Sequence, residues 1–343
     1  MEHVAIDLGG RESQVCIRRA DGTVVEERRC RTDELGMYLA RRPPSRVVVE
    51  TCAEAFHVTD LAKAAGHEVR VVPSMLVRTL GVGNRGVKND RKDAQVLSEV
   101  STRIELPSVH VPTQESRERR ATCTSREALV AARTQLINSA RGWMRTEGVR
   151  VRQGATESFP LRLRSTGGAK LPTHIESILQ VIELLNTQIA EADRRLREIA
   201  ESSATCRLLM TMPGVGPVTA VRMMAALDDV SRFDNASKVA SYLGLVPGED
   251  SSSGRQRRTG ITKAGPPSVR RTLIQAAWCV RRVRPFDPMV IWAAEIERRR
   301  GKHIAVVALA RKMAGVLFAM WRDMKPYAAK RAARACLPEA PMA

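Results

Sequence analysis

Two short runs of β-branched and apolar residues near the start of the chain each end in a carboxylate. HVAID ends at Asp7, and RVVVE ends at Glu50. Apolar runs of this length, bounded by turn residues, are typical of strands that are buried on both faces. Such strands need helices to cover them, so the pattern predicts a helix-covered sheet with carboxylates at its strand ends.

The other elements of the first hundred residues complete an α/β pattern. SQVCIRR and TVVEERR flank the turn ADG, as two strands of a tight hairpin do. A short helix over 32–41 stops before two prolines, and AEAFHVTDLAKAAG predicts a helix that ends at Gly66. EVRVVP predicts another buried strand. The order β-β-β-α-β-α-β-α over residues 1–101 is that of an α/β RNase H-like (RuvC-like) domain.

Two further carboxylates, Asp90 and Asp93, lie in the helical segment KNDRKDAQVLSEV. Their spacing of three residues puts both on one face of a helix. Four carboxylates at one edge of a sheet repel one another unless cations lie between them, and hard divalent cations prefer oxygen ligands. We therefore predict a site for Mg²⁺ or Mn²⁺, with two ions about 4 Å apart as phosphoryl transfer uses them.

Each carboxylate also has a simpler explanation. An Asp after a strand is often a turn residue, and Asp90 could cap its helix. DLGG also opens the phosphate-binding hairpin of actin-like sugar kinases, which share this sheet topology. Those kinases repeat the fold in a second lobe with another glycine-rich loop, and the sequence after residue 101 has no such repeat. The nuclease interpretation is therefore favoured.

The charge of the chain indicates a polyanionic partner. Fifty-six Lys and Arg against 37 Asp and Glu give a net charge of +19. From residue 251 onward there are 20 basic and 5 acidic residues, a net of +15, so the excess is concentrated and not a uniform bias. Concentrated positive charge favours nucleic-acid binding by the C-terminal half. Aromatic residues make up only 3%, which argues against a base-stacking RRM or OB surface.

The cysteines and the N-terminus favour a cytoplasmic protein. Seven cysteines are scattered without a CxxC pair, which favours reduced thiols over a zinc site or a disulfide framework. The N-terminus lacks the pattern of a secretory signal. The apolar stretch 304–321 carries Arg311 and Lys312 at its centre, so it predicts a buried helix and no membrane span.

Residues 102–205 predict a helical connector. The segment 115–146 is helical and polar, and 150–173 has no periodicity and predicts a loop or hinge. Apolar residues then recur at alternating spacings of three and four, which is the pattern of a coiled coil. The partner could be the 115–146 helix of the same chain or another protomer, and the sequence leaves both open. These positions are Ile175, Ile178, Ile182, Leu185, Ile189, Ala192, Leu196 and Ile199.

The remaining part of the chain, 206–330, predicts a mostly α C-terminal domain, followed by a basic tail at 331–343. PGVGPVTA resembles the turn of a helix-hairpin-helix motif, in which Gly214 and Gly216 permit a tight bend and backbone amides can face a phosphate. A plain corner between two helices would have the same short pattern.

A loop rich in serine and arginine, GEDSSSGRQRRTGITKAG, lies within this domain. A serine hydroxyl becomes a nucleophile only when its proton is removed and the developing charge is stabilised. Arginines beside it would hold a phosphate by paired hydrogen bonds. A flexible basic loop whose serines only add solubility would have the same composition.

The ordered blocks of the whole chain resemble the DEDD transposases of the insertion-sequence 110 family. AIDLGG, VVVE followed by Thr, VVP and KNDRKDA are similar to the RuvC-like domain of that family. MPGVGPVTA, RFDNASKVASYLGLVPGEDSSSG and GITKAGPPSVRRTLIQAAW are similar to its C-terminal transposase domain. One departure is Asn89, where the family often has Thr.

The resemblance implies a site-specific DNA recombinase with two sets of reactive residues. Asp7, Glu50, Asp90 and Asp93 would bind the metal, and Ser253 would be the nucleophile that forms a phosphoserine link, with Ser252 in its place if the register slips by one. Donor and target DNA, a structured noncoding guide RNA, and a dimer or tetramer are the implied partners. Nucleic-acid binding is expected of Arg255, Arg257, Arg258, Lys263, Arg270, Arg271, Gly214 and Gly216.

Two other classes of function fit parts of the pattern. A RuvC-like structure-specific nuclease would cut branched DNA with metal-activated water and would form no covalent adduct. A nucleic-acid-binding protein with a vestigial nuclease fold would show no change on Asp7→Asn. A protein–DNA adduct that resists denaturation separates the recombinase from both.

Overall fold

The computed structural model describes residues 1–79, 90–166, 171–249 and 258–329, which form two compact units. The first unit is Met1–Pro112 and the second is Thr113–Ala343. The first unit extends past the boundary expected at residue 101, and the expected connector and C-terminal domain share the second unit. The finer division at 205 stays a prediction, and the basic tail lies outside the described residues.

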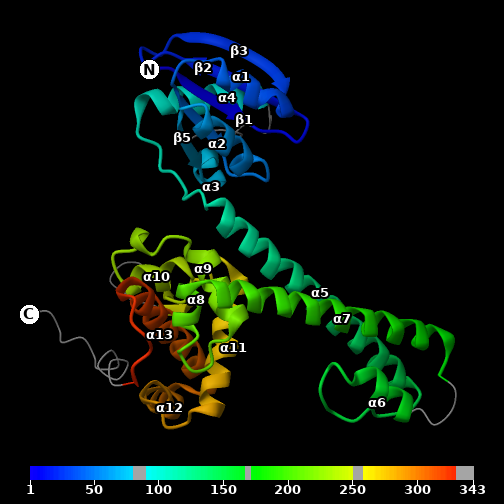
Figure 1. The fold of residues 1–343 in the computed structure, drawn as a ribbon. Helices are drawn as coiled ribbons and strands as arrows, with labels where there is room; N and C mark the ends of the chain where they lie inside the picture. The colour runs from blue at the N-terminus through cyan, green and yellow to red at the C-terminus, as the bar shows by residue number, and fades with distance from the viewer. Residues whose placement is uncertain (80–89, 167–170, 250–257, 330–343) are drawn as a thin grey trace, which may run out of the picture. The chain divides into compact units, whose positions relative to one another are not determined.

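The first unit is built on a mixed five-stranded sheet with the strand order β3-β2-β1-β4-β5 (Figure 1). Strands β1, β2 and β3 are antiparallel neighbours, whereas β4 runs parallel to both β1 and β5. This topology is compatible with the RNase H-like fold expected from the sequence. The strands are β1 His3–Asp7, β2 Glu12–Arg18, β3 Val24–Arg31, β4 Arg46–Glu50 and β5 Glu68–Val72.

Helices cover both faces of this sheet, because the strand residues alternate between two cores. Val4 and Ile6 of β1 pack with α1 and α2, whereas Ala5 packs with α4 on the opposite face. All three residues are completely buried, as the apolar run HVAID predicts. The helices of this unit are η1 Thr32–Glu34, α1 Leu35–Ala40, α2 Ala55–Ala64, α3 Ser74–Thr79 and α4 Asp90–Arg103.

The second unit begins with two long helices that pack against each other within the chain, α5 Gln114–Thr146 and α7 Thr173–Ser202 (Figure 1). Four of the eight expected seam positions are buried, namely Ile175, Ile182, Ile189 and Leu196; the other four are half-buried. The buried stripe runs instead through Leu179 and Ala200. The coiled-coil geometry and any pairing between protomers stay predictions.

Two polar contacts from α5 explain why the buried stripe differs from the apolar heptad. Arg133 of α5 donates to Asn186 Oδ1 of α7 at 2.9 Å, and Arg126 Nε donates to Asp193 Oδ1 at 2.6 Å. Asn186 and Asp193 lie on the helix face that Leu179 and Ala200 share. The apolar periodicity alone could not reveal this face, because half of its positions are polar.

The segment 150–173 is not the structureless loop that the sequence predicts. It contains α6, Phe159–Thr166, whose Phe159 and Leu163 are completely buried against α5 and α7. The four-residue spacing puts both side chains on one helix face. A helix of eight residues, about two turns, between glycine- and arginine-rich flanks is too short for a periodicity to stand out.

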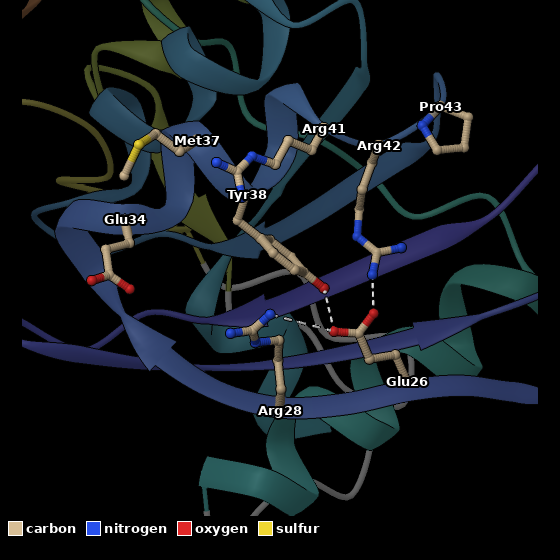
Figure 2. A pocket seen from close by; sticks show the side chains of 8 residues that line it. All are labelled: Glu26, Arg28, Glu34, Met37, Tyr38, Arg41, Arg42 and Pro43. Carbon is tan, nitrogen blue, oxygen red and sulfur yellow. Dashed lines mark hydrogen bonds and ion pairs between the residues drawn. The ribbon is translucent and has the colours of Figure 1, made fainter.

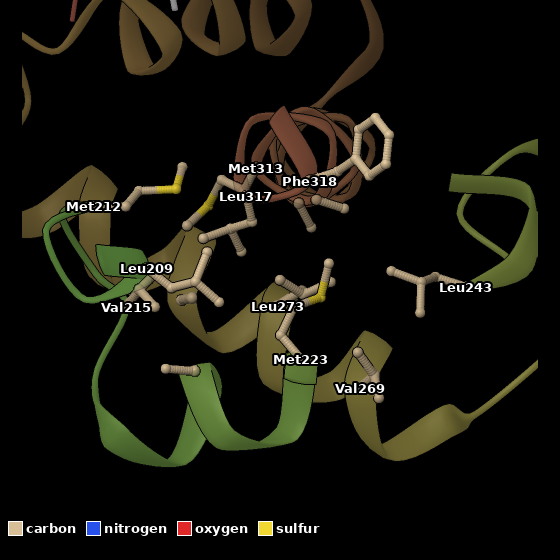
Figure 3. Packing of buried hydrophobic residues seen from close by; sticks show 14 of the residues in the cluster. Leu209, Met212, Val215, Met223, Leu243, Val269, Leu273, Met313, Leu317 and Phe318 are labelled. Atoms are coloured by element: carbon tan, nitrogen blue, oxygen red, sulfur yellow. The ribbon is translucent and has the colours of Figure 1, made fainter. Parts of the chain in front are cut away.

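The rest of the second unit is a mostly helical domain around one large core (Figure 3). Leu209, Met223, Leu273 and Leu317 meet there from four different helices. Its elements are α8 Ala204–Leu209, α9 Pro217–Leu227, η2 Val230–Arg232, α10 Ala236–Tyr242, β6 Pro247–Glu249, β7 Arg258–Ile261, α11 Pro267–Val283, α12 Pro288–Arg300 and α13 Lys302–Asp323.

Helix α13 is long and apolar enough to cross a membrane by length and composition, and among the described residues no other helix is. Leu309, Met313 and Leu317 are nevertheless completely buried within the protein, where α13 packs against α10, α11 and α12. The helix thus forms the centre of the core, as the stretch 304–321 predicted.

Candidate active site

Asp7 and Glu50 lie at the same edge of the sheet, at the carboxyl ends of neighbouring parallel strands. Asp7 is the last residue of β1 and Glu50 the last of β4, and the preceding pair, Ile6 and Val49, are direct partners in the ladder. Ile6 and Val49 are completely buried, whereas both carboxylates are half-buried. The strand pairing therefore brings together two of the four acidic residues expected from the sequence.

Helix α4 runs back along β1, which directs its first turn toward this edge. Near the end of α4, Ser101 Oγ lies 2.8 Å from His3 Nδ1 at the start of β1. The eight residues from Ser101 back to Asp93 rise about 12 Å along a helix, and the four from His3 to Asp7 rise about 13 Å along a strand. Asp93 is accordingly expected at the level of Asp7.

Contacts with the antiparallel half of the sheet hold α4 in place. Arg18 Nε of β2 donates to Ser98 Oγ at 3.0 Å. Glu27 of β3 accepts hydrogen bonds from Gln95 and from Arg91, the second residue of α4. These bonds from Gln95 and Arg91 lower the pKa of the Glu27 carboxyl, so Glu27 is an anion that anchors the first turn.

The donor set fits a hard divalent cation, although the described side chains do not complete a site. Among the described residues no group of three or more His, Cys, Asp or Glu is close enough to hold a metal. Asp7, Glu50 and Asp93 are among the described residues, so the structure does not bring these three within metal-binding distance of one another, and the Asp90 side chain lies outside the described residues. Carboxylate oxygens at two strand ends and a helix start are the ligands that Mg²⁺ and Mn²⁺ prefer.

Residues 250–257 of the serine loop lie outside the described residues, and these include Ser252, Ser253, Arg255 and Arg257. The strands on either side of it, β6 and β7, are antiparallel, and Glu249 pairs with Arg258. This pairing fixes the two ends of the segment 250–257 next to each other. The backbone of Arg258 is described and its side chain is not.

Two glycines and one arginine build the base of this loop. Gly244 (φ +65°) and Gly265 (φ +68°) lie where the turn after α10 crosses the turn before α11. A Cβ on Gly244 would lie 2.1 Å from the Ala264 carbonyl oxygen, and one on Gly265 would lie 2.0 Å from that of Tyr242. Only glycine permits this approach, because these φ values and distances leave no room for a side chain.

Arg270 holds the two turns together. Its guanidinium donates to the carbonyl oxygens of Leu243 at 3.1 Å, Ala264 at 2.5 Å and Gly265 at 3.0 Å, and the residue is 8% exposed. The predicted contact of Arg270 with nucleic acid remains untested. The described contacts show that Arg270 holds the base of the serine loop.

The other expected nucleic-acid contacts differ in their surroundings. Arg271 pairs with Glu127 of α5, a carboxylate shared with the buried Arg222 of α9. Sequence reasoning missed Glu127 and Arg222, because nothing local links residues about a hundred positions apart. Lys263 is exposed and, among the described residues, makes no ion pair. Its predicted contact with nucleic acid remains untested.

The two glycines of the PGVGPVTA motif have different environments. Gly214 adopts a φ of +81°, and a Cβ there would lie 2.7 Å from the Ala276 carbonyl oxygen of α11. Gly214 therefore permits close packing of two helices, as in a plain helix corner. Gly216 caps α9, and a Cβ on it would meet no atom within 4 Å. An amide–phosphate contact stays a prediction for both.

A pocket of about 500 Å³ lies on the first unit, between β3 and α1 (Figure 2). Tyr38 forms its centre, with the guanidinium groups of Arg28 and Arg42 at 5.0 Å and 4.8 Å from its ring. Its hydroxyl donates to Glu26 at 3.0 Å, and burial raises its pKa to about 12. No local sequence pattern predicts this pocket, and Arg28 and Arg42 in its wall both pair with Glu26.

Comparison with known proteins extends over both units. Residues 4–147 match a family model described as a DEDD transposase, and residues 206–288 match the model of the IS116/IS110/IS902 family of transposases. The former indicates dependence on a divalent metal.

Several named transposases align over most of the chain. One from Coxiella burnetii, the transposase for insertion sequence element IS1111A, is 29% identical and covers 94% of this chain and 90% of its own length. The putative transposase y4rJ of Sinorhizobium fredii is 30% identical, over 81% of this chain and 76% of its own length. The transposase for insertion sequence element IS1328 of Yersinia enterocolitica is 27% identical, and the alignment covers 91% of this chain and 94% of its own length. Two family models in order and similarity to these relatives over most of their length establish that the chain belongs to the IS116/IS110/IS902 family of insertion-sequence transposases, enzymes that cut and rejoin DNA.

Proposed function

We propose that this transposase cuts and rejoins DNA through Ser253, assisted by a metal-dependent acidic site at Asp7, Glu50, Asp90 and Asp93. The observation that carries the acidic half is the position of Asp7 and Glu50 at the ends of paired parallel strands. The serine half rests on the family resemblance of the SSSG block and on the anchored base of its loop.

In the proposed reaction the Ser253 Oγ attacks a backbone phosphorus. A new O–P bond forms as one bridging P–O bond breaks, and the serine proton ends on the departing DNA oxygen, which becomes a free hydroxyl. A bound divalent cation would lower the repulsion among the carboxylates and neutralise charge on the phosphate. Attack by a hydroxyl of a second DNA end on the phosphoserine restores the serine and joins the strands.

The partners belong to the same proposal. The excess of positive charge after residue 251 suits DNA, and the family resemblance implies a noncoding guide RNA and a dimer or tetramer. In a homo-oligomer the serine and the carboxylates that act on one phosphate need not come from one chain. Mg²⁺ is the expected ion, and Mn²⁺ has the same ligand preference.

The test is the capture of the covalent intermediate. Full-length protein, RNA transcribed from the element and labelled target DNA are incubated with Mg²⁺, and the adduct is detected after denaturation. We expect Ser253→Ala to abolish the adduct, and Ser251→Ala, in the same serine run, to keep it. An adduct lost with Ser252→Ala and kept with Ser253→Ala would move the nucleophile by one residue.

The same assay separates the alternatives. DNA cleavage by the wild type with no adduct would favour a RuvC-like nuclease that uses water. Cleavage and adduct formation without the RNA would exclude RNA guidance while leaving the serine mechanism intact.

A further inference from the structure

A group of exposed basic residues lies at the ends of three helices in the second unit, away from the serine loop in the sequence. Helix α11 ends at Val283, α12 ends at Arg300, and α13 begins at Lys302. We call this group the helix-end patch. Its members are Arg282, Arg284, Arg298, Arg299, Arg300 and Lys302.

Contacts around one tryptophan show that the three helix ends lie together. Trp278 of α11 has the Arg281 guanidinium 5.4 Å and the Lys302 Nζ 5.0 Å from its ring centre, and this joins α11 to the start of α13. Arg281 also forms an ion pair with Glu297, which joins α11 to the last turn of α12. The positive charges of the patch therefore occupy one part of the surface.

This positive charge exceeds that of the nearby carboxylates, which include Glu295 one helical turn before the α12 arginines. All six members are exposed, and among the described residues none of them forms an ion pair. Glu297, the acidic residue closest in sequence to the α12 arginines, is already paired with Arg281. Six uncompensated cations in one place repel one another, and this repulsion falls when an anion binds.

Helix dipoles explain only part of the arrangement. Arginines in the last turns of α11 and α12 are favourable, because the C-terminus of a helix is partially negative. Lys302 and His303 occupy the first turn of α13, where the partial charge is positive and where no acidic residue is present. The helix dipole disfavours a cation there, and the contact with the Trp278 ring offsets part of that cost.

We propose that the helix-end patch binds the sugar-phosphate backbone of duplex DNA without regard to sequence, as a contact separate from the serine loop; this inference rests on the proposed function in DNA transposition. Arginine and lysine side chains are the usual partners of backbone phosphates. Two cations already lie near the Trp278 ring, so this ring is not a free face for stacking bases.

The experiment measures DNA affinity as a function of salt with the full chain. A fluorescein-labelled DNA duplex of random sequence is titrated with wild type and with the triple variant Arg298→Gln/Arg299→Gln/Arg300→Gln. Each lost phosphate contact lowers the slope of log affinity against log salt by about 1. We expect the triple variant to lower this slope by about 2 to 3. The decrease should be the same for every duplex sequence, because backbone phosphates carry no sequence information.

A matched control removes the same charge elsewhere in the same unit. Arg145, Arg150 and Arg152 are also exposed and, among the described residues, form no ion pair; replacing them with Gln should leave the slope near the wild-type value. Equal losses in both triple variants would overturn the proposal, because binding would then follow net charge alone. Thermal unfolding of both variants checks that the exposed substitutions leave the fold intact.

Two further arms test the choice of duplex DNA. Phe286, in the turn after α11, is 88% exposed, and Phe286→Ala should leave duplex affinity unchanged. A selective loss of single-strand binding in this variant, or a loss of binding to an RNA hairpin but not to DNA by the arginine triple variant, would overturn the assignment. If the wild type forms no protein–DNA adduct but the arginine triple variant lowers the salt slope as expected, only the proposed function is wrong. If the wild type forms the adduct but the triple variant leaves the salt slope unchanged, only the proposal for the helix-end patch is wrong.

Discussion

The acidic edge of the sheet and the base of the serine loop are held in place by different means. Asp7 and Glu50 follow strand residues that are completely buried, so the pairing of β1 with β4 determines where their backbones lie. The loop base depends on Gly244, Gly265 and the guanidinium of Arg270. Substitutions at the acidic edge should therefore reduce DNA cleavage without changing the unfolding free energy. Substitutions at the loop base should reduce both.

The largest effect is expected at the acidic edge, on activity alone. Asp7→Asn keeps the size of the side chain but removes its charge, so metal binding weakens and DNA cleavage should fall at least about 10³-fold. The unfolding free energy should change by less than about 0.5 kcal/mol, as for a substitution outside the core. Single-turnover cleavage and urea denaturation measure the two quantities.

Asp60→Asn, at an exposed position of α2, is the control and should leave cleavage unchanged. Cleavage by the Asp7 variant within tenfold of wild type would contradict a catalytic acidic edge.

The next effect is on stability, at the loop base. Gly265→Ala places a Cβ 2.0 Å from the Tyr242 carbonyl oxygen in a left-handed conformation. The strain and the forced backbone shift should together cost about 3 to 5 kcal/mol. Gly301→Ala is the matched control, because Gly301 has a φ of +85° but open space around it, and the backbone strain alone costs about 1 to 2 kcal/mol. Similar losses for both would show that the crossing of the two turns is not tight.

Arg270→Met should cost somewhat less, about 2 to 3 kcal/mol, because it removes a charged donor from three carbonyl oxygens, one of them on the buried Leu243. Hydrogen exchange should rise in the turns around Leu243 and Ala264 before the rest of the unit opens. Arg271→Met, whose side chain is 62% exposed, should change stability by less than about 1 kcal/mol. If both variants lose the same stability, Arg270 does not anchor the loop.

The smallest effect is a pH dependence of the first unit through His3. Burial, followed by the nearby Arg46, lowers the pKa of the His3 imidazole below its usual value of 6.5. The unfolded chain then binds the proton more readily than the folded one, so stability is full above pH 6.5 and is lost as the pH falls through that value. Urea titrations from pH 8 to pH 5 should show this loss of stability in the wild type and a smaller loss in His3→Gln.

Much of the first unit could be predicted because its information is local. HVAID and RVVVE are strands for reasons contained in five residues each, and a parallel pairing then puts Asp7 and Glu50 at one edge. The short helix α6 was missed, because Phe159 and Leu163 become an apolar face only when α5 and α7 supply the surface to cover it. The heptad identified α7 correctly but only four of its six buried residues, since Asn186 and Asp193 share the other buried face with Leu179 and Ala200 through partners in α5.

By itself the sequence determined the element order of the first unit, its strand-end carboxylates, the basic character of the C-terminal half and, through resemblance, the family. The tertiary structure decided which cations are structural and which are available. The sequence alone does not show that Arg270 is buried and Arg282 is exposed. One is surrounded by the carbonyl oxygens of two crossing turns and the other is exposed at a helix end, and only the packing of distant segments creates that difference.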